Sequence, residues 1–157
     1  MSLPDQPGSY ILILHNPAPA RINVGRLGCH TFPAGWYAYT GSARGPGGLA
    51  ARLARHLRPE KAAHWHIDYV RPHMEPVAIW YTTGTQKLEC DWANAFLDVP
   101  GTSIPVARAG ASDCRCPAHL FYIDHAPALK DFVRTREETI QCLDLREPWE
   151  TQKASPR

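Results

Sequence analysis

The sequence predicts a small α+β domain, in which a mainly antiparallel central sheet is flanked by helices. The apolar run at residues 10–14 is typical of a buried central strand, and the aromatic residues at 36–39 fit a second, half-buried strand. Between residues 49 and 57 the period changes, because leucines recur at every fourth position, as on one face of an amphipathic helix. Glycines and a proline separate the second strand from this helix, where neither kind of element tolerates them well.

The remaining elements are predicted from the same patterns. In chain order they are an edge strand at 21–27, a segment at 64–70 that fits either a short helix or a strand, a strand at 77–81, a helix at 87–99, a long loop at 100–115, a strand at 119–123 and a helix at 128–140. The domain organisation expected is a loose lead-in at 1–7, one folded domain at 8–145 and a flexible polar tail at 146–157.

The composition predicts an ordinary globular domain. A chain of 157 residues is long enough for one core, and 44% hydrophobic with 20% charged residues is typical of a soluble globule. The formal charge of +2 does not by itself indicate a nucleic-acid binder. The distribution of charge is more informative, because residues 44–58 hold four arginines and no acid.

The first residues and the cysteines suggest the compartment. Residues 1–10 have neither the charged nor the apolar region of a signal peptide, and no apolar run approaches the length of a membrane span. Five cysteines, an odd number, favour reduced thiols or metal ligands over disulfides. We therefore expect a cytoplasmic protein without membrane contact, whose oligomeric state the sequence leaves open.

Three short motifs stand in order around the glycine-rich turn. They are Gly8-Ser9-Tyr10, Tyr39-Thr40-Gly41 and the pair Arg52 and His56, which lie one helical turn apart. Their order and spacing resemble the GIY-YIG nuclease superfamily. The segments SYILIL, YAYTGSARGPGGLAARLARHLR, HWHIDYV, LEC and SDCRCPAHLFY resemble more narrowly its Uri-type branch, a small stand-alone domain that is sometimes fused to endonuclease III. The resemblance covers about residues 8–124.

The resemblance implies a set of site residues. The catalytic ones are Tyr10 as general base, Tyr39 to orient the water or hold Tyr10, Arg52 over the phosphate, His56 near the leaving group or a tyrosine, and Glu89 as the ligand of one Mg²⁺ or Mn²⁺. The substrate-binding ones are Gly41, Ser42, Arg44, Arg55 and Arg58.

Two features depart from the family pattern. Ser9 and Thr40 replace branched apolar residues, which is tolerable if those positions lie outside the deep core. The turn before the helix is longer than the family's short form, so Arg52 rests on its spacing to His56, and Arg55 is its rival.

Simpler explanations stand beside these roles. An arginine-rich helix face is often only solvated, a first-turn glutamate often only faces the helix dipole, and strand tyrosines often only pack. A free tyrosine with a pKa near 10 is about a thousandth ionised at pH 7, a handicap of roughly 4 kcal/mol for a general base. A metal, Arg52 and His56 would each reduce it by favouring the phenolate.

Two further clusters have metal-ligand chemistry. Cys90, Cys114, Cys116 and His119 could form a Cys₃His zinc site, or could be buried reduced thiols. His64-Trp65-His66-Ile67-Asp68 is similar in spacing to the H-X-H-X-D motif of metallohydrolases, but no further ligand set follows it. We expect instead that His66 and Asp68 form a hydrogen-bonded pair that supports the site.

The function predicted is that of a metal-dependent DNA endonuclease with low sequence specificity. The alternatives are a non-catalytic nucleic-acid-binding module, which would keep only the basic groove, and a zinc-stabilised interaction domain, which would need only the cysteines and histidine. Single-stranded, duplex and branched DNA all remain open as substrates, and RNA is not excluded.

Overall fold

The computed structural model describes residues 3–58, 62–133, 136 and 138–146, and across them it forms the single α+β domain that the sequence predicts. The strands are β1 (Gly8–Asn16), β2 (Ala20–Asn23), β3 (Cys29–Phe32), β4 (Gly35–Ala43), β5 (Glu75–Thr83), β6 (Thr102–Ser103), β7 (Leu120–Ile123) and β8 (Gln141–Asp144). The α-helices are α1 (Gly48–Leu57), α2 (His66–Val70), α3 (Glu89–Phe96) and α4 (Leu129–Val133), and two 3₁₀ turns span Gly25–Leu27 and Arg71–His73.

The main sheet has six strands in the order β6-β7-β4-β1-β5-β8, and every neighbouring pair is antiparallel. β1 lies in the middle and pairs with β4 and β5 along its length. Because both faces of β1 are covered, its sequence is an almost continuous apolar run rather than an alternation. β2 and β3 form a separate two-stranded sheet.

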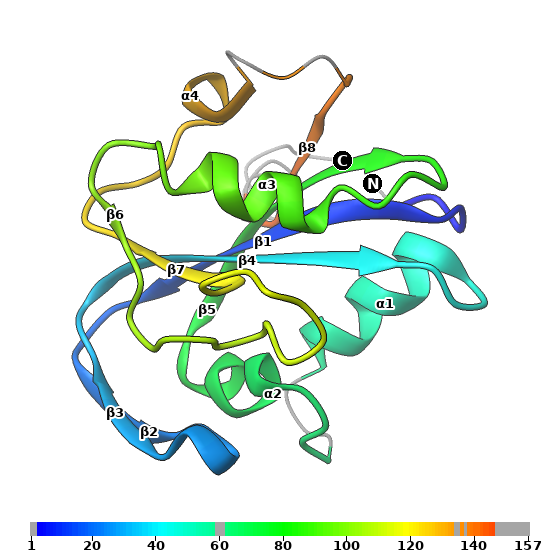
Figure 1. Ribbon diagram of the computed structural model, residues 1–157. Coiled ribbons are helices and arrows are strands. Elements are labelled where there is room, and N and C mark those ends of the chain that lie inside the picture. The colour runs from blue at the N-terminus through cyan, green and yellow to red at the C-terminus, as the bar shows by residue number, and fades with distance from the viewer. Residues whose placement is uncertain (1–2, 59–61, 134–135, 137, 147–157) are drawn as a thin grey trace, which may run out of the picture.

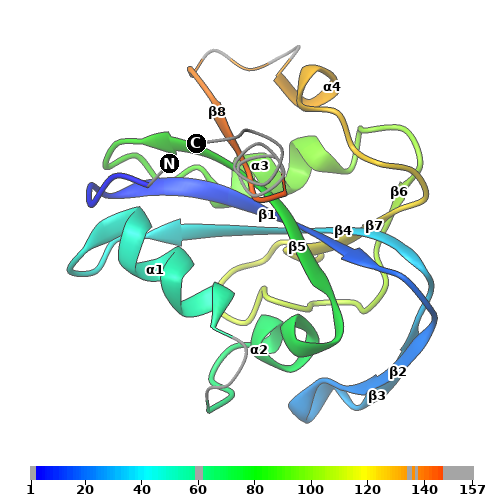
Figure 2. The same cartoon turned by 180° about the vertical axis from the view of Figure 1, so that it is seen from behind.

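Alternate residues of β1 divide the core into two layers. Tyr10, Leu12 and Leu14 face the layer that includes the leucines of α1 and the apolar residues of α2. Ile11 and Ile13 face the layer that holds the aromatic residues of α3 and α4. Accordingly, α3 lies in front of the sheet in Figure 1, and α1 lies in front in the reverse view of Figure 2.

Within the loose lead-in predicted at 1–7, residues 4–6 instead cap α1, and residues 1–2 lie outside the described residues. The backbone N–H groups of Leu49 and Ala50 donate to the carbonyls of Gln6 and Pro4, both at 2.9 Å. These contacts satisfy donors that a helix N-terminus cannot satisfy internally. Gly48 permits this approach, because a Cβ there would lie 2.2 Å from the Gln6 carbonyl oxygen.

Two predicted elements are wrong in part. The strand expected at 21–27 ends at Asn23, after which Gly25 adopts a left-handed conformation in the first 3₁₀ turn. The helix expected at 128–140 ends at Val133; residues 138–140 are not helical, and 134, 135 and 137 lie outside the described residues. The chain then forms β8, which the sequence did not predict and which completes the edge of β5.

Other boundaries agree with the sequence or extend it. The segment at 64–70 is resolved as the short helix α2, and the strand expected at 77–81 is β5 with two further residues at each end. Residues 147–157 of the expected tail lie outside the described residues. None of the helices in the described part of the chain has the length and apolar character that crossing a membrane requires.

Candidate functional site

A pocket of about 300 Å³ opens beside β4 at the point where β7 stops pairing with it. β7 covers β4 only from Trp36 to Tyr39, so the second half of β4 has no strand on that side. The segment 106–119 and the starts of α2 and α3 surround this gap, so residues from both faces of the sheet line one pocket. The lining residues are Tyr39, Thr40, Gly41, Ser42, Arg44, Arg52, His64, Trp65, His66, Lys87, Glu89, Cys90, Gly110, Ser112, Asp113, Cys114 and His119.

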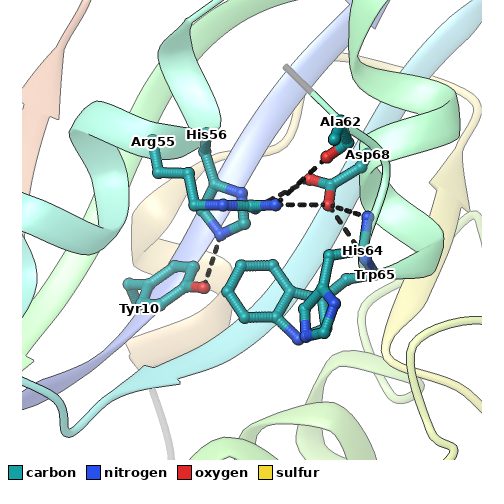
Figure 3. A network of polar contacts seen from close by, with 7 residues as sticks. All are labelled: Tyr10, Arg55, His56, Ala62, His64, Trp65 and Asp68. Carbon is teal, nitrogen blue, oxygen red and sulfur yellow. Dashed lines mark hydrogen bonds and ion pairs between the residues drawn. The ribbon is translucent and has the colours of Figure 1, made fainter.

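Tyr10 lies behind this pocket rather than in its wall. Its side chain is fully buried, and its hydroxyl shares a 2.7 Å hydrogen bond with Nε2 of His56, as Figure 3 shows. Gly41 stands directly opposite on β4, and a Cβ there would lie 2.4 Å from the Tyr10 hydroxyl oxygen. Gly41 of the second motif is therefore needed to make room for Tyr10 of the first.

Burial dominates the acid–base behaviour of both tyrosines. It raises the pKa of Tyr10 well above the usual value, with a smaller increase from Tyr39 and an opposing decrease from Arg52. Burial also raises the pKa of Tyr39 to about 12, again against Arg52. Arg52 lowers the pKa of both tyrosines, as the sequence predicted, but burial of the phenolate raises each pKa by more than Arg52 lowers it. Without a bound cation both tyrosines are neutral near pH 7.

Arg52 extends from α1 into the pocket and is held on two sides. Its Nη1 donates to the Ser42 carbonyl at 2.8 Å, and its guanidinium lies 4.6 Å from the centroid of the Trp65 ring. Its charge acts on both Tyr10 and Tyr39. The arginine predicted from its spacing to His56 is thus the one that lines the pocket beside Tyr39.

Arg55, the rival of Arg52 and a predicted substrate contact, is used inside the fold. Its guanidinium donates to both carboxylate oxygens of Asp68, at 3.0 and 2.9 Å, and lies 4.2 Å from the Trp65 ring centroid (Figure 3). The Asp68 side chain is fully buried and also accepts from the backbone N–H groups of His64 and Trp65. Burial would raise the pKa of Asp68, but Arg55 and these N–H groups outweigh it and lower the pKa.

The expected pairing of His66 with Asp68 is wrong. Asp68 bonds to Arg55, whereas Nδ1 of His66 accepts from the backbone N–H of Gly110 at 2.8 Å. This second contact ties the start of α2 to the segment 106–119. Because Asp68 is already satisfied by an arginine, the H-X-H-X-D spacing does not assemble a metal site here.

Glu89 begins α3 and presents its carboxylate to the pocket. Its Oε2 is buried and has no hydrogen-bond partner in the part of the chain that the structure describes. A buried carboxylate oxygen without a partner is costly, and a hard divalent cation is one ligand that would satisfy it. Glu89 therefore fits the role of a Mg²⁺ or Mn²⁺ ligand that the family resemblance implied.

The other predicted substrate contacts separate into two groups. Gly41, Ser42 and Arg44 line the pocket, and Arg44 also donates to the Thr85 carbonyl. Arg58 is at the C-terminal end of α1 and is not among the lining residues.

Cys90, Cys114, Cys116 and His119 come together at the other side of the pocket and could hold a metal ion. One donor atom from each lies within 4.8 Å of all the others. Nε2 of His119 is 3.2 Å from Sγ of Cys114 and 3.8 Å from Sγ of Cys90. Burial raises the pKa of Cys90 and raises that of Cys116 to about 12, so these thiols would release protons on binding a cation. Three thiols and an imidazole form a donor set typical of structural zinc.

Ser9 and Thr40 lie in the core, although the sequence predicted that these polar residues would be tolerated only outside it. Each of them has a polar partner. Both are 1% exposed. The Ser9 hydroxyl accepts from the backbone N–H of Leu88 at 3.3 Å, and Oγ1 of Thr40 lies 2.5 Å from Nδ1 of His119. The two departures from the family pattern thus connect the central strands to α3 and to the Cys/His cluster.

Trp65 is the main site residue that the sequence argument missed. Its ring contacts the guanidinium groups of both Arg52 and Arg55 and lies 5.9 Å from the ring of His56. The signal available in the sequence was the position of a tryptophan between two histidines close to an arginine-rich helix. Aromatic faces attract guanidinium groups, but spacing alone does not show which arginine meets the ring.

Comparison with known proteins defines the family. The sequence model described as "Domain of unknown function DUF123" matches residues 9–142. The chain belongs to this family.

A curated protein with a local match to this DUF123 chain is the trans-aconitate 2-methyltransferase of Azoarcus sp. (strain BH72). The two are 40% identical over 79 residues, which make up 48% of this chain and 30% of the methyltransferase. The match thus spans less than a third of that protein. No solved structure matches the chain.

Proposed function

We propose that this DUF123 chain is a metal-dependent DNA endonuclease of the GIY-YIG type, with low sequence specificity. The observation that carries the proposal is the meeting of Tyr39, Arg52 and Glu89 in one pocket. Tyr39 comes from β4 within the sheet, whereas Arg52 and Glu89 come from α1 and α3, which pack on opposite faces of the sheet. Packing alone does not require a phenol, a guanidinium and a carboxylate to converge on a solvent-open space.

Hydrolysis of a phosphodiester needs an activated water and positive charge over the phosphate. In this proposal Glu89 holds one Mg²⁺ or Mn²⁺ through the carboxylate that includes the unpartnered Oε2. When bound, that ion supplies Lewis-acid charge and lowers the pKa of coordinated water. One protein carboxylate suffices, because Mg²⁺ keeps several waters and takes a further ligand from the phosphate.

Arg52 provides the second positive charge. Contacts with Ser42 and Trp65 already fix its guanidinium, so little reorganisation is needed when negative charge develops on a phosphate oxygen. Arg44 and Lys87, also in the wall, extend the positive potential along a bound strand.

The two tyrosines take different tasks. Tyr39 lines the pocket and is the phenol placed to contact water or phosphate. Tyr10 is buried behind it, with ring centroids 6.4 Å apart, and holds His56 by a hydrogen bond. Because burial opposes ionisation of Tyr10, we assign it to positioning, and a role as general base would require the bound cation to lower its pKa.

The test is cleavage of supercoiled plasmid and of single-stranded DNA with Mg²⁺ or Mn²⁺, comparing wild type with Glu89→Gln. We expect the variant to lose cleavage by about 10³-fold or more, since metal charge stabilisation amounts to several kcal/mol, while retaining DNA binding. Asp91→Asn is the matched control, because it removes an exposed carboxylate from the same helix. Metal-dependent cleavage at the wild-type rate by folded Glu89→Gln protein would refute the assignment.

A non-catalytic nucleic-acid-binding module is the second candidate. It is favoured by the raised pKa values of both tyrosines, which a binder tolerates and a base catalyst must overcome. This module would bind DNA with a salt dependence set by its arginines and would cleave none of the substrates at any Mg²⁺ or Mn²⁺ concentration.

A further inference from the structure

The cysteine side of the pocket, formed by Cys90, Cys114, Cys116 and His119, has no task in the cleavage chemistry above. We propose that it binds one Zn²⁺, and that this ion holds the segment 106–119 against the first turn of α3 and so positions Glu89. The zinc site stands on its own geometry, and only the positioning of Glu89 rests on the proposed function.

The donor atoms are separated by distances close to those of a zinc tetrahedron. With Zn–S near 2.3 Å and Zn–N near 2.0 Å, neighbouring ligand atoms are separated by about 3.5–3.8 Å. The sulfur–nitrogen separations are 3.2 Å for Cys114, just below this range, and 3.8 Å for Cys90, at its upper end, and all four donor atoms lie within 4.8 Å of one another. Soft thiols select zinc over Mg²⁺, which keeps this site chemically distinct from Glu89.

His119 is oriented for such a role by a contact behind it. Its side chain is 3% exposed, and Nδ1 is 2.5 Å from the Thr40 hydroxyl. A proton on Nδ1 that is donated to Thr40 leaves the lone pair of Nε2 facing the sulfur atoms. This arrangement, in which the second ring nitrogen is fixed by a hydrogen bond, is the usual one for histidine ligands of metals.

The segment that carries Cys114 and Cys116 is shaped for ligation without regular secondary structure. The guanidinium of Arg108 donates to the carbonyls of Cys114 and Cys116, at 2.6 and 2.5 Å. Arg108 itself adopts a left-handed backbone conformation, with φ of 69°. A non-glycine residue retains such a conformation only where its surroundings impose it, as the hydrogen bond from its N–H to the Pro117 carbonyl does here.

The link to the nuclease-like residues is direct along the chain. Cys90 follows Glu89 in the first turn of α3, where no side chain caps the helix. Thr40, which holds His119, lies between Tyr39 and Gly41 in β4. An ion bound by Cys90 and by the segment 106–119 would therefore fix the helix turn from which Glu89 reaches the pocket.

The first experiment counts metal. Protein purified without chelator should contain about one zinc per chain by elemental analysis, and Co²⁺ added to the stripped protein should give thiolate-to-cobalt charge-transfer and tetrahedral d–d absorption. Cys116→Ser should lose both signals, whereas Cys29→Ser, an exposed thiol on β3, should keep them. Wild-type protein with no zinc and no tetrahedral Co²⁺ spectrum would overturn the site and leave buried thiols.

The second experiment measures the coupling. Mn²⁺ binding, followed by the electron paramagnetic resonance of free Mn²⁺, is compared in zinc-loaded wild type, zinc-stripped wild type and zinc-loaded Glu89→Gln. We expect stripping to weaken Mn²⁺ binding by about tenfold or more, as loss of a positioning contact does at metal sites. Glu89→Gln should lose Mn²⁺ binding but keep its zinc.

Each outcome has one meaning. Equal Mn²⁺ affinity with and without zinc overturns the positioning role, even if zinc is bound. Unfolding on stripping, seen by circular dichroism, supports the structural role of the ion. If the protein binds zinc but takes up no Mn²⁺ at Glu89, the zinc site stands and the proposed role of Glu89 as a Mg²⁺ or Mn²⁺ ligand is refuted.

Discussion

The two sides of the pocket hold their polar residues by different means. On the tyrosine–arginine side, comprising Tyr39, Arg52 and Trp65 with Tyr10 and His56 behind them, most residues come from β1, β4 and α1. Hydrogen bonds and cation–π contacts within the protein connect this side. On the cysteine side, three of the four donors come from the segment 106–119, and the fourth comes from α3. This segment lies between the short strands β6 and β7 and has neither helix nor strand of its own.

This difference indicates what each side requires to keep its shape. Strands and helices fix their side chains through backbone hydrogen bonds and packing, so the tyrosine–arginine side needs no added ion. A segment held mainly by turns and by Arg108 gains most from a cross-link, and its soft sulfur and nitrogen donors lie close enough together to share one metal ion. Substitutions on the tyrosine–arginine side and at residues next to it test this difference.

Arg52→Ala should lower the cleavage rate at saturating DNA by about 10²–10³-fold, or roughly 3–4 kcal/mol of transition-state stabilisation. The cause is removal of the charge beside Tyr39 and the phosphate site. The measurement is single-turnover cleavage at one fixed salt concentration. If the rate is unchanged while DNA affinity falls, Arg52 is only a binding residue.

Asp68→Asn should lower the free energy of unfolding by about 3 kcal/mol, because it leaves the Arg55 charge in a part-buried position without its partner. Urea titration measures this at neutral pH. The pKa of Asp68 is lowered in the folded protein, so its contribution is present above the ordinary carboxyl pKa and is lost as pH falls through the lowered value. The difference between wild type and variant should therefore shrink in acid; a constant difference down to pH 2 would contradict this.

Trp65→Leu keeps an apolar, though smaller, side chain and removes the aromatic face from both guanidinium groups. Cation–π contacts at part-desolvated sites are worth about 1–2 kcal/mol, so we expect the cleavage rate to fall about tenfold with DNA affinity nearly unchanged. Trp65→Phe should recover part of the rate, since it restores a ring. Equal rates for the two variants would show that Trp65 does not position Arg52 through its ring.

Arg44→Ala should produce the smallest change, because Arg44 is exposed and touches the protein through one carbonyl. Loss of one phosphate contact should weaken DNA binding a few-fold and reduce the slope of log affinity against log salt by about one. The maximal cleavage rate should stay the same. An unchanged salt slope would place Arg44 outside the path of the DNA.

Local pattern was sufficient to predict much of the fold. The apolar run of β1 and the fourfold leucine repeat of α1 record burial directly, and the structure confirms the predicted α+β class with an antiparallel sheet. β8 escaped prediction because its residues alternate weakly, and its pairing is decided by the free edge of β5, about 60 residues away in the chain.

For the site, the amino-acid sequence shows which residue types are available and at what spacing: two tyrosines, Arg52 with His56, Glu89, and three cysteines with a histidine. Their partners become visible only in the folded chain, where Arg55 pairs with Asp68, Tyr10 is buried behind Tyr39, Trp65 contacts both arginines, and Cys90 meets Cys114, Cys116 and His119. Spacing along the chain shows which residues share one face of an element, whereas a charge pair or a ligand set depends on distances between elements.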